Sequence, residues 1–176
     1  MNDLEILNQC FEPDFENGIL YLKERPREHF VNDSGYKNHL NRVGQDISSN
    51  TKCGYKEIRI HLYGKMYRRY VHRCIYMMYH NVLLKRSQII DHIDGNVSNN
   101  CIDNIRLCTP SQNAFNCGKK NKNVSYEKGR NKPYRVVLKM NGKSHSFGYY
   151  STLEEANKVA HDLREKYHGE FANHGE

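Results

Sequence analysis

Near the middle of this chain, two short apolar runs are separated by a loop rich in Asp, Gly, Asn and Ser. The runs QIID at 88–91 and NIRLC at 104–108 have the length and composition of strands. In the next segment, TPSQNAFN, Thr109 is placed to act as N-cap, Pro110 occupies the first helical position and Gln112 closes a capping box. The predicted order is therefore strand, polar loop, strand and capped helix.

Four side chains of this unit have types suited to metal-assisted hydrolysis. A hairpin followed by a helix is expected to bring to one end of the unit Asp91, His92, Asn104 and Asn113. The carboxylate of Asp91 and the amide oxygen of Asn113 are hard ligands that suit Mg²⁺, which keeps several waters and takes phosphate oxygens as further ligands. His92, with a reference pKa of ~6.5, can take a proton from water at neutral pH. The pattern predicts a Mg²⁺ site, in which Mn²⁺ can substitute, beside a histidine base.

Segments on both sides of this unit predict small sheets. Upstream, the segment GYKEIRIHLYGKMYRRYVHR is typical of a β-hairpin with its turn at residues 63–65. Residues 72–80 are typical of a short buried helix. Downstream, a linker of Gly, Asn and Lys precedes three short runs, of which the last two are joined by an Asn-Gly pair at 141–142. A helix with one apolar stripe follows, with Ser151 and Glu154 as its capping box. The predicted fold class is α+β, with a small N-terminal β-rich region, a central ββα core and a C-terminal three-stranded antiparallel sheet packed by one helix.

Positive charge is concentrated in two stretches of this chain, whose formal net charge is +7. Residues 51–90 hold nine Lys or Arg against one Glu, and residues 118–176 hold twelve against seven acidic residues. Residues 91–117, between them, hold one Arg against three Asp. This distribution fits a phosphate backbone gripped on both sides of a cation site, and on charge alone two solvated faces fit equally well.

Length, hydropathy and cysteine spacing exclude several classes of protein. A chain of 176 residues is too short for a large multidomain enzyme. No apolar run approaches the ~18–20 residues that cross a bilayer, and the N-terminus has no signal-peptide pattern, so we expect no membrane association and a cytoplasmic location. Because no export signal is visible, reduced thiols are expected in place of a disulfide framework. The six cysteines include no C-x-x-C pair, the spacing that most strongly signals a structural zinc site, so such a site is not expected.

The string DHIDGNVSNNCIDNIRLCTPSQN resembles the ββα-metal core of HNH endonucleases in the order and spacing of its polar residues. The resemblance implies that Asp91 and Asn113 bind one divalent metal ion. It also implies that His92 is the general base and that Asn104 holds the histidine-bearing loop in shape. The N-terminal FEPDFENGILYLKERP and the basic hairpin are similar to the leader region of phage enzymes of this kind.

The segment 118–174 resembles the Apetala-type (ethylene-response-factor) DNA-binding domain through NVSYEK, YRVVLKMNGK, SFGYYSTLEEA and HGEFAN. Phage HNH homing endonucleases often end in this domain, whose first strand usually carries a Trp where Tyr126 stands here. The sheet face away from the helix is expected to carry Arg135, Lys139, Lys143 and His145. Contacts with DNA, mostly with phosphates, are predicted for Arg68, Arg69, His72, Arg73, Lys119, Lys120, Lys122, Tyr126, Lys128, Arg130, Arg135, Lys139, Lys143 and His145.

Taken together, these patterns divide the chain into four parts. They are a leader region at 1–50, an HNH nuclease domain at 51–117, a basic linker at 118–122 and an Apetala-type domain at 123–176. Two roles remain open for His72, a structural one and contact with phosphate, and both are favoured over metal binding.

The predicted function is that of a metal-dependent DNA endonuclease of the HNH homing type, which leaves 5′-phosphate and 3′-hydroxyl ends. Its expected partner is double-stranded DNA, with no obligate protein partner; we expect a monomer that acts in the bacterial cytoplasm if it is phage-encoded. The main alternative is a sequence-preferring DNA-binding regulator with a catalytically silent nuclease core. A third possibility, a zinc-stabilised interaction protein, requires bound zinc. The competent residue types at all four site positions favour the enzyme.

Overall fold

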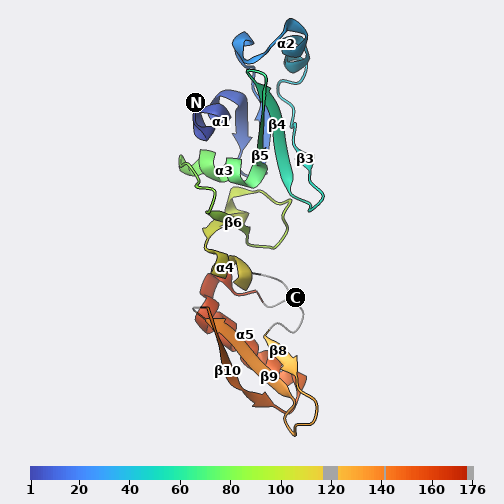
Figure 1. The fold of residues 1–176 in the computed structure, drawn as a ribbon, viewed down its shortest axis with the longest axis vertical. Coiled ribbons are helices and arrows are strands. Elements are labelled where there is room, and N and C mark those ends of the chain that lie inside the picture. The colour runs from blue at the N-terminus through green and yellow to red at the C-terminus, as the bar shows by residue number, and fades with distance from the viewer. Residues whose placement is uncertain (117–122, 141, 174–176) are drawn as a thin grey trace. The chain divides into compact units, whose positions relative to one another are not determined.

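The computed structural model describes residues 1–116, 123–140 and 142–173. It divides into two compact units, Met1–Cys108 and Thr109–Glu176 (Figure 1). The first unit ends nine residues before the predicted end of the nuclease domain at residue 117. The domain limits drawn from the sequence stay a prediction. Outside the described residues lie the predicted linker contacts and the first residue of the Asn-Gly turn, namely Lys119, Lys120, Lys122 and Asn141.

The first unit combines three helices with three small antiparallel sheets. The first sheet consists of β1 and β2, the second of β3, β4 and β5 in that order, and the third of β6 and β7. In chain order the elements are α1 Asp3–Cys10, β1 Phe11–Asp14, β2 Ile19–Leu22, α2 Asp33–Leu40, β3 Ser49–Asn50, β4 Lys56–Leu62, β5 Lys65–Tyr70, α3 Val71–His80, β6 Ile89–His92 and β7 Ile105–Cys108.

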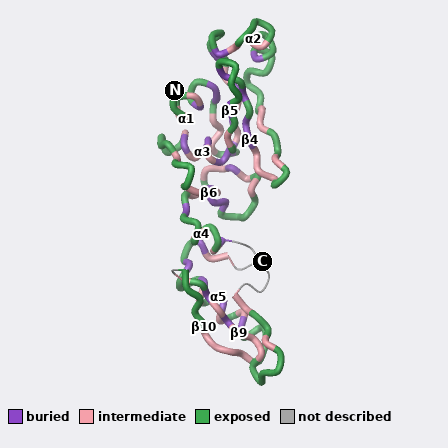
Figure 2. The backbone as a smooth tube through the Cα atoms, in the orientation of Figure 1, coloured by how far each residue is buried: buried purple, intermediate pink, exposed green. Residues whose placement is uncertain are grey.

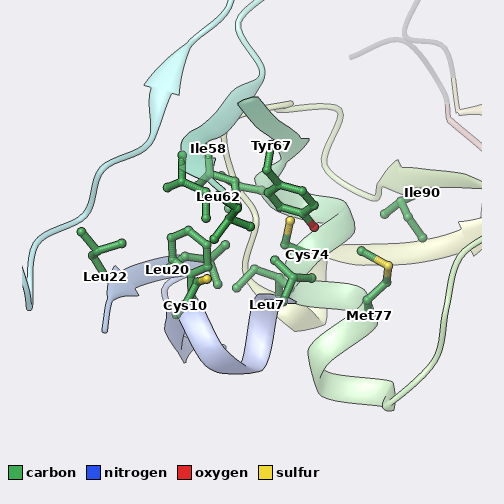
Figure 3. Close-up of a cluster of buried hydrophobic side chains, with 14 of the residues drawn as sticks. Leu7, Cys10, Leu20, Leu22, Ile58, Leu62, Tyr67, Cys74, Met77 and Ile90 are labelled. Atoms are coloured by element: carbon green, nitrogen blue, oxygen red, sulfur yellow. The ribbon is translucent and has the colours of Figure 1, made fainter. Parts of the chain in front are cut away.

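One hydrophobic core joins the leader region to the rest of the first unit. Alternate residues of β4 are buried because successive side chains of a strand point to opposite faces. They pack with side chains from α1, β2 and α3, and with one side chain from β6 (Figure 3). Figure 2 shows buried stretches along α1, α3 and β4. Members of this core include Leu7, Cys10, Leu20, Leu22, Ile58, Leu62, Tyr67, Cys74, Met77 and Ile90. Residues 1–50 therefore fold together with residues 51–108.

The leader region contains more helix than the sequence patterns indicated. The predicted β-rich character of the region is confirmed by a small strand pair, in which Phe11 pairs with Leu22 and Asp14 with Ile19. Helices α1 and α2 were not predicted. Helix α1 nevertheless has a local signal, because Asn2 and Glu5 form a reciprocal capping box at its N-terminus.

The second unit contains the predicted three-stranded antiparallel sheet and the helix that packs on it. Its elements are α4 Pro110–Phe115, β8 Val124–Tyr126, β9 Tyr134–Met140, β10 Lys143–Tyr150 and α5 Leu153–His168, with the strands ordered β10, β9, β8. The core between sheet and helix is formed by Val136, Ala156 and Ala160. Helix α5 begins one residue later than predicted, with Thr152 as its N-cap accepting a hydrogen bond from the Glu155 N–H. The predicted α+β fold class is confirmed.

The register of the β9–β10 hairpin corrects one expectation about the free face of the sheet. Lys143 pairs with Met140, and His145 pairs with Leu138. Directly paired residues of an antiparallel sheet point to the same face, so Lys143 and His145 lie on the helix side of the sheet plane. Arg135 lies on the opposite face, together with Lys139. The expectation that all four residues share one face was therefore wrong for Lys143 and His145.

Within the described part of the chain, no helix combines the length and the hydropathy that crossing a membrane requires.

Candidate active site

Strands β6 and β7 present the Asp-His pair at the end of a short hairpin. In their register Asp91 lies opposite Arg106, and His92 lies opposite Ile105. Both polar side chains are nearly inaccessible, since Asp91 is 6% and His92 4% exposed. Buried polar groups of this kind need partners, and these partners define the site.

The loop between β6 and β7 is closed by reciprocal hydrogen bonds of Asn104. Its side-chain oxygen accepts from the Asp94 N–H at 3.0 Å, and its Nδ2 donates to Asp94 Oδ1 at 2.9 Å and to the Asn99 carbonyl at 2.8 Å. The backbone adds a bond from the Ile93 N–H to the Asn104 carbonyl. Asn104 thus ties both ends of the loop together, which is the role that the family resemblance implies for it.

Asp94 shapes the same loop from within. Its carboxylate accepts from the Asn96 N–H and from Asn99 Nδ2, each at 2.8 Å, besides the bond from Asn104. Burial opposes the charged form, but these hydrogen bonds outweigh burial and hold the pKa of Asp94 below its ordinary value. Asp94, Asn96 and Asn99 all shape the loop through Asx hydrogen bonds, in which each side-chain oxygen accepts from the backbone N–H two residues on.

His92 is held by a buried amide and two rings. Its Nε2 lies 3.0 Å from the side-chain oxygen of Asn100, a residue that is only 1% exposed. The ring of His72 meets His92 edge-on at 5.1 Å between centroids, and the ring of Tyr55 lies 6.0 Å away. The approach of Asn100 and Tyr55 to His92 was not predicted from the sequence, since it depends on tertiary contacts.

His72 is buried beside the candidate base. Burial, and then electrostatic interaction with His92 and Arg73, lowers the pKa of His72 to about 3. Its ring also stacks on Tyr70 at 5.6 Å. This buried environment favours the structural role of His72. The predicted contact of His72 with DNA stays a prediction.

Arg106 is a further site residue that the sequence patterns did not reveal. Its Nε and its terminal nitrogen donate to Asp91 Oδ2 at 3.1 and 3.0 Å. The pair is largely buried, so each charge stabilises the other. The signal that could have revealed it is the cross-strand register, because Arg106 faces Asp91 in the hairpin.

The second predicted metal ligand, Asn113, lies on α4 in the second unit. The helix has the predicted local structure, because Thr109 accepts from the Gln112 N–H, Gln112 reaches back to the Thr109 N–H and Pro110 occupies the first turn. The contribution of Asn113 to the same site as Asp91 stays a prediction.

The donor set fits a hard divalent ion. Among the described residues, no three His, Cys, Asp or Glu side chains gather into a metal-binding group. Mg²⁺ does not require such a group, because it is usually held by one or two protein oxygens together with waters and substrate phosphates. The buried carboxylate of Asp91, next to the His92 imidazole, is a donor of that kind.

An open cavity of about 710 Å³ in the first unit is lined by arginines that were predicted to contact DNA. Arg69 forms a two-pronged pair with Asp3 at 2.8 Å, while Arg68 pairs with the buried Glu57. Arg73 donates to the backbone carbonyls of residues 85 and 88. A guanidinium has five N–H donors, so these contacts orient the side chains without using all of their donors. The residues lining the cavity include Arg68, Arg69, Arg73 and Arg86.

In the second unit, the free face of the sheet carries cations organised around a tyrosine. Arg130 lies over the Tyr149 ring at 4.3 Å, and Arg135 at 5.8 Å. Both pair with Glu127, which offsets part of their charge. Exposed residues of this unit that were predicted to bind DNA are Tyr126, Lys128, Arg130, Lys139, Lys143 and His145. Their contact with DNA stays a prediction.

The β6–β7 hairpin, the loop closed by Asn104 and the capped helix α4 follow one another in the order that the sequence predicts for a ββα core. The family described as HNH endonuclease matches residues 69–115, a range that includes all four predicted site residues. "Protein 3.8" of Escherichia phage T7 is 34% identical over 94 residues, which cover 51% of this chain and 77% of that protein. The chain belongs to the HNH endonuclease family, which confirms the predicted resemblance at the level of the family. Members of this family typically use a divalent metal ion.

Two further similarities cover more of the chain. The "Uncharacterized HNH endonuclease L560" of Acanthamoeba polyphaga mimivirus is 30% identical over 139 residues, or 79% of this chain and 66% of that protein. The chain thus spans slightly less than two thirds of the mimivirus protein. The solved structure described as DNA binding and cleavage by the HNH homing endonuclease I-HmuI has a TM-score of 0.45 and 18% identity, with 92% of this chain and 81% of that chain covered.

Proposed function

We propose that this protein is a metal-dependent DNA endonuclease of the homing type, which hydrolyses phosphodiester bonds of double-stranded DNA. The observation that supports it most directly is the environment of His92. The imidazole stands at a strand end directly after a buried Asp and beside a loop tied by Asn104. The family match over residues 69–115 supports the same function.

In the proposed reaction, His92 takes a proton from the attacking water. The water oxygen then bonds to phosphorus, and the bond from phosphorus to the 3′-oxygen breaks. The products are a 5′-phosphate and a 3′-hydroxyl end. A positioned general base of this kind contributes a factor of about 10²–10⁴ in rate.

Asp91 and Asn113 are the proposed ligands of one divalent ion, Mg²⁺ or Mn²⁺. When bound, the ion supplies charge stabilisation at the phosphorus centre and at the leaving oxygen. Arg106 pairs with the Asp91 carboxylate and fixes its position within the hairpin. Asn104 preserves the loop that joins the two strands.

We propose that the arginine-lined cavity and the second unit grip the DNA backbone. The cavity combines several guanidinium groups with only two acidic side chains, Asp3 and Glu57. The second unit resembles the Apetala-type domain in sequence, and its sheet presents Arg135 and Lys139 on the face away from α5. Lys and Arg at such positions bind phosphates and give affinity before sequence preference.

The test is cleavage of plasmid DNA that carries the sequence flanking the gene, with Mg²⁺ or Mn²⁺ present. His92→Ala should cut about 10²–10⁴-fold more slowly than the wild type. His61→Ala is the matched control, because His61 is exposed on β4 and belongs to no part of the proposed site. Equal rates for His92→Ala and the wild type would refute the assignment of the base.

A DNA-binding regulator with a silent nuclease core gives a different result in the same experiment. It would bind the flanking DNA but leave it uncut at every metal concentration. Binding without cleavage would refute the proposed function in favour of the regulator. Metal-dependent nicking would show that the nuclease core is not silent and would exclude the regulator.

A further inference from the structure

We propose that Asn100 is a positioning residue that fixes His92 in the tautomer with its proton on Nε2. The proposal rests on the proposed function, because it assigns the lone pair of the general base to Nδ1. The observation that carries it is the 3.0 Å contact between Asn100 Oδ1 and His92 Nε2 inside the protein. A neutral imidazole has one N–H, so an amide oxygen that accepts from Nε2 leaves the lone pair on Nδ1.

The burial of Asn100 indicates that its side-chain oxygen has a specific role in the contact with His92. Asn100 is 1% exposed, and its Nδ2 has no hydrogen-bond partner among the described residues. A buried donor without a partner destabilises the folded state. A side chain needed only to fill space would avoid that cost by being apolar. The contact of Asn100 Oδ1 with His92 Nε2 therefore accounts for an amide at this buried position.

The backbone of Asn100 is fixed by the turn between β1 and β2. Gly18 packs so closely there that a Cβ on it would lie 2.2 Å from the Asn100 carbonyl carbon and 2.5 Å from the Cys101 nitrogen. The Phe15 carbonyl accepts a hydrogen bond from the Ile102 N–H at 2.9 Å. The leader region therefore supports the segment that places the Asn100 amide beside His92.

Two rings confine His92 on other sides. The His72 ring is nearly perpendicular to that of His92, at an interplanar angle of 72°, and the Tyr55 ring is tilted by 55°. These ring contacts restrict where the imidazole lies, but neither of them selects a tautomer. The oxygen of Asn100, in contrast, can accept a hydrogen bond from only one of the two tautomers at Nε2.

The experiment compares Asn100→Leu with Asn100→Asp in the full chain. Leu keeps a similar volume without an acceptor, while Asp keeps an oxygen at the same distance from the backbone. Imidazole ¹H–¹⁵N spectra at a pH of about 8, where an ordinary histidine is neutral, report the tautomer. The His92 signals are those missing from the spectrum of His92→Ala.

We expect the Nε2–H form in the wild type and in Asn100→Asp, and a loss of that preference in Asn100→Leu. Cleavage by Asn100→Leu should be slower by about 10²-fold, the lower end of a general-base contribution, with rescue in Asn100→Asp. A predominant Nδ1–H form in the wild type would overturn the proposal, even if Asn100→Leu failed to fold. An unchanged tautomer and cleavage rate in folded Asn100→Leu would also overturn it.

The two readouts separate this inference from the proposed function. If the wild type cleaves no DNA, the proposed function fails, while the spectra still decide whether Asn100 fixes the tautomer of His92. If the wild type cleaves DNA but the tautomer is wrong or independent of Asn100, only the positioning role fails.

Discussion

Gly18 and Asn100 approach so closely that a methyl group on Gly18 would overlap the backbone carbonyl of Asn100, with its carbon 2.2 Å from the carbonyl carbon. Gly18 lies in the turn between β1 and β2, 82 positions before Asn100 in the chain. The side chain of Asn100 in turn contacts His92. A residue of the leader region is therefore two contacts away from the candidate base.

Replacing Gly18 by Ala should destabilise the first unit. The φ of Gly18 is +63°, where an L-residue costs about 1–2 kcal/mol, and the overlap with Asn100 should add about 1–3 kcal/mol. Gly44→Ala is the matched control, since its φ is +78° and a Cβ there would meet no atom within 4 Å. Urea unfolding should show the larger loss for Gly18→Ala. Similar losses for both variants would mean that the close approach has no energetic effect.

Removal of divalent metal should stop cleavage without abolishing DNA binding. Chelation should bring nicking to background, and added Mg²⁺ or Mn²⁺ should restore it, because the ion stabilises charge that develops only during the reaction. Asp91→Ala should remain inactive in excess metal. Asp103→Ala, which removes an exposed carboxylate near the same hairpin, should retain activity. Metal-independent nicking by the purified wild type, or full activity of Asp91→Ala, would contradict the metal assignment.

Local patterns predicted those parts of the site whose partners lie three or four residues apart. The capping box of Thr109 and Gln112 is confirmed as predicted, because an N-cap and its third residue meet in any helix that starts there. The predicted start of α5 was one residue early, since Ser151 and Thr152 are both competent caps and Thr152 is the one that accepts from the Glu155 N–H. Adjacent capping residues cannot be ranked without the helix's tertiary contacts.

Contacts between distant segments were beyond the sequence patterns. Asn100 reaches His92, and Arg106 reaches Asp91, only once the pairing of β6 with β7 and the path of the loop are known. The contact of Gly18 with this loop has no local signal other than a Gly in a turn. By contrast, the face of Lys143 could have been predicted, because a two-residue hairpin loop fixes its pairing with Met140.

Two buried histidines should make the protein less stable in mild acid. Burial, and then the charge of Arg25, lower the pKa of His39 to about 4, while the pKa of His72 falls to about 3. Below a pH of about 6.5 the unfolded chain binds protons at these imidazoles and the folded chain does not. Their contribution to stability is therefore complete above pH ~6.5 and declines as the pH falls toward the folded pKa values.

The variant that isolates this effect is His39→Gln, because Gln can still accept the hydrogen bond that the Arg25 N–H donates to His39 Nε2. Urea midpoints at a pH of about 7 and about 5 should differ less in this variant than in the wild type. His61→Gln, at an exposed position, should keep the wild-type difference. Equal pH dependence in all three proteins would show that His39 does not bind a proton on unfolding.

Neutralising the free face of the second unit should weaken DNA binding and its salt dependence together. For each phosphate that a cation of the protein no longer neutralises, the slope of log affinity against log salt should fall by about 0.9. Arg135→Gln with Lys139→Gln should therefore lower the slope by up to about 1.8 if both side chains bind phosphates. Lys158→Gln, at an exposed position of α5, is the control with the same kind of substitution. An unchanged slope in the double variant would remove this face from the proposed DNA-binding surface.

The core shared by the leader region and the rest of the first unit limits which segments can be exchanged between related proteins. Side chains such as Leu7 and Leu20 pack with Ile58 and Ile75, so a fragment limited to the family-matched residues 69–115 would leave apolar surfaces uncovered. Residues 1–108 form one compact unit and keep this interior together. Recombination between relatives should preserve these residues as a block, with crossover points tolerated more readily beyond Cys108 than between the leader and the hairpin that carries His92.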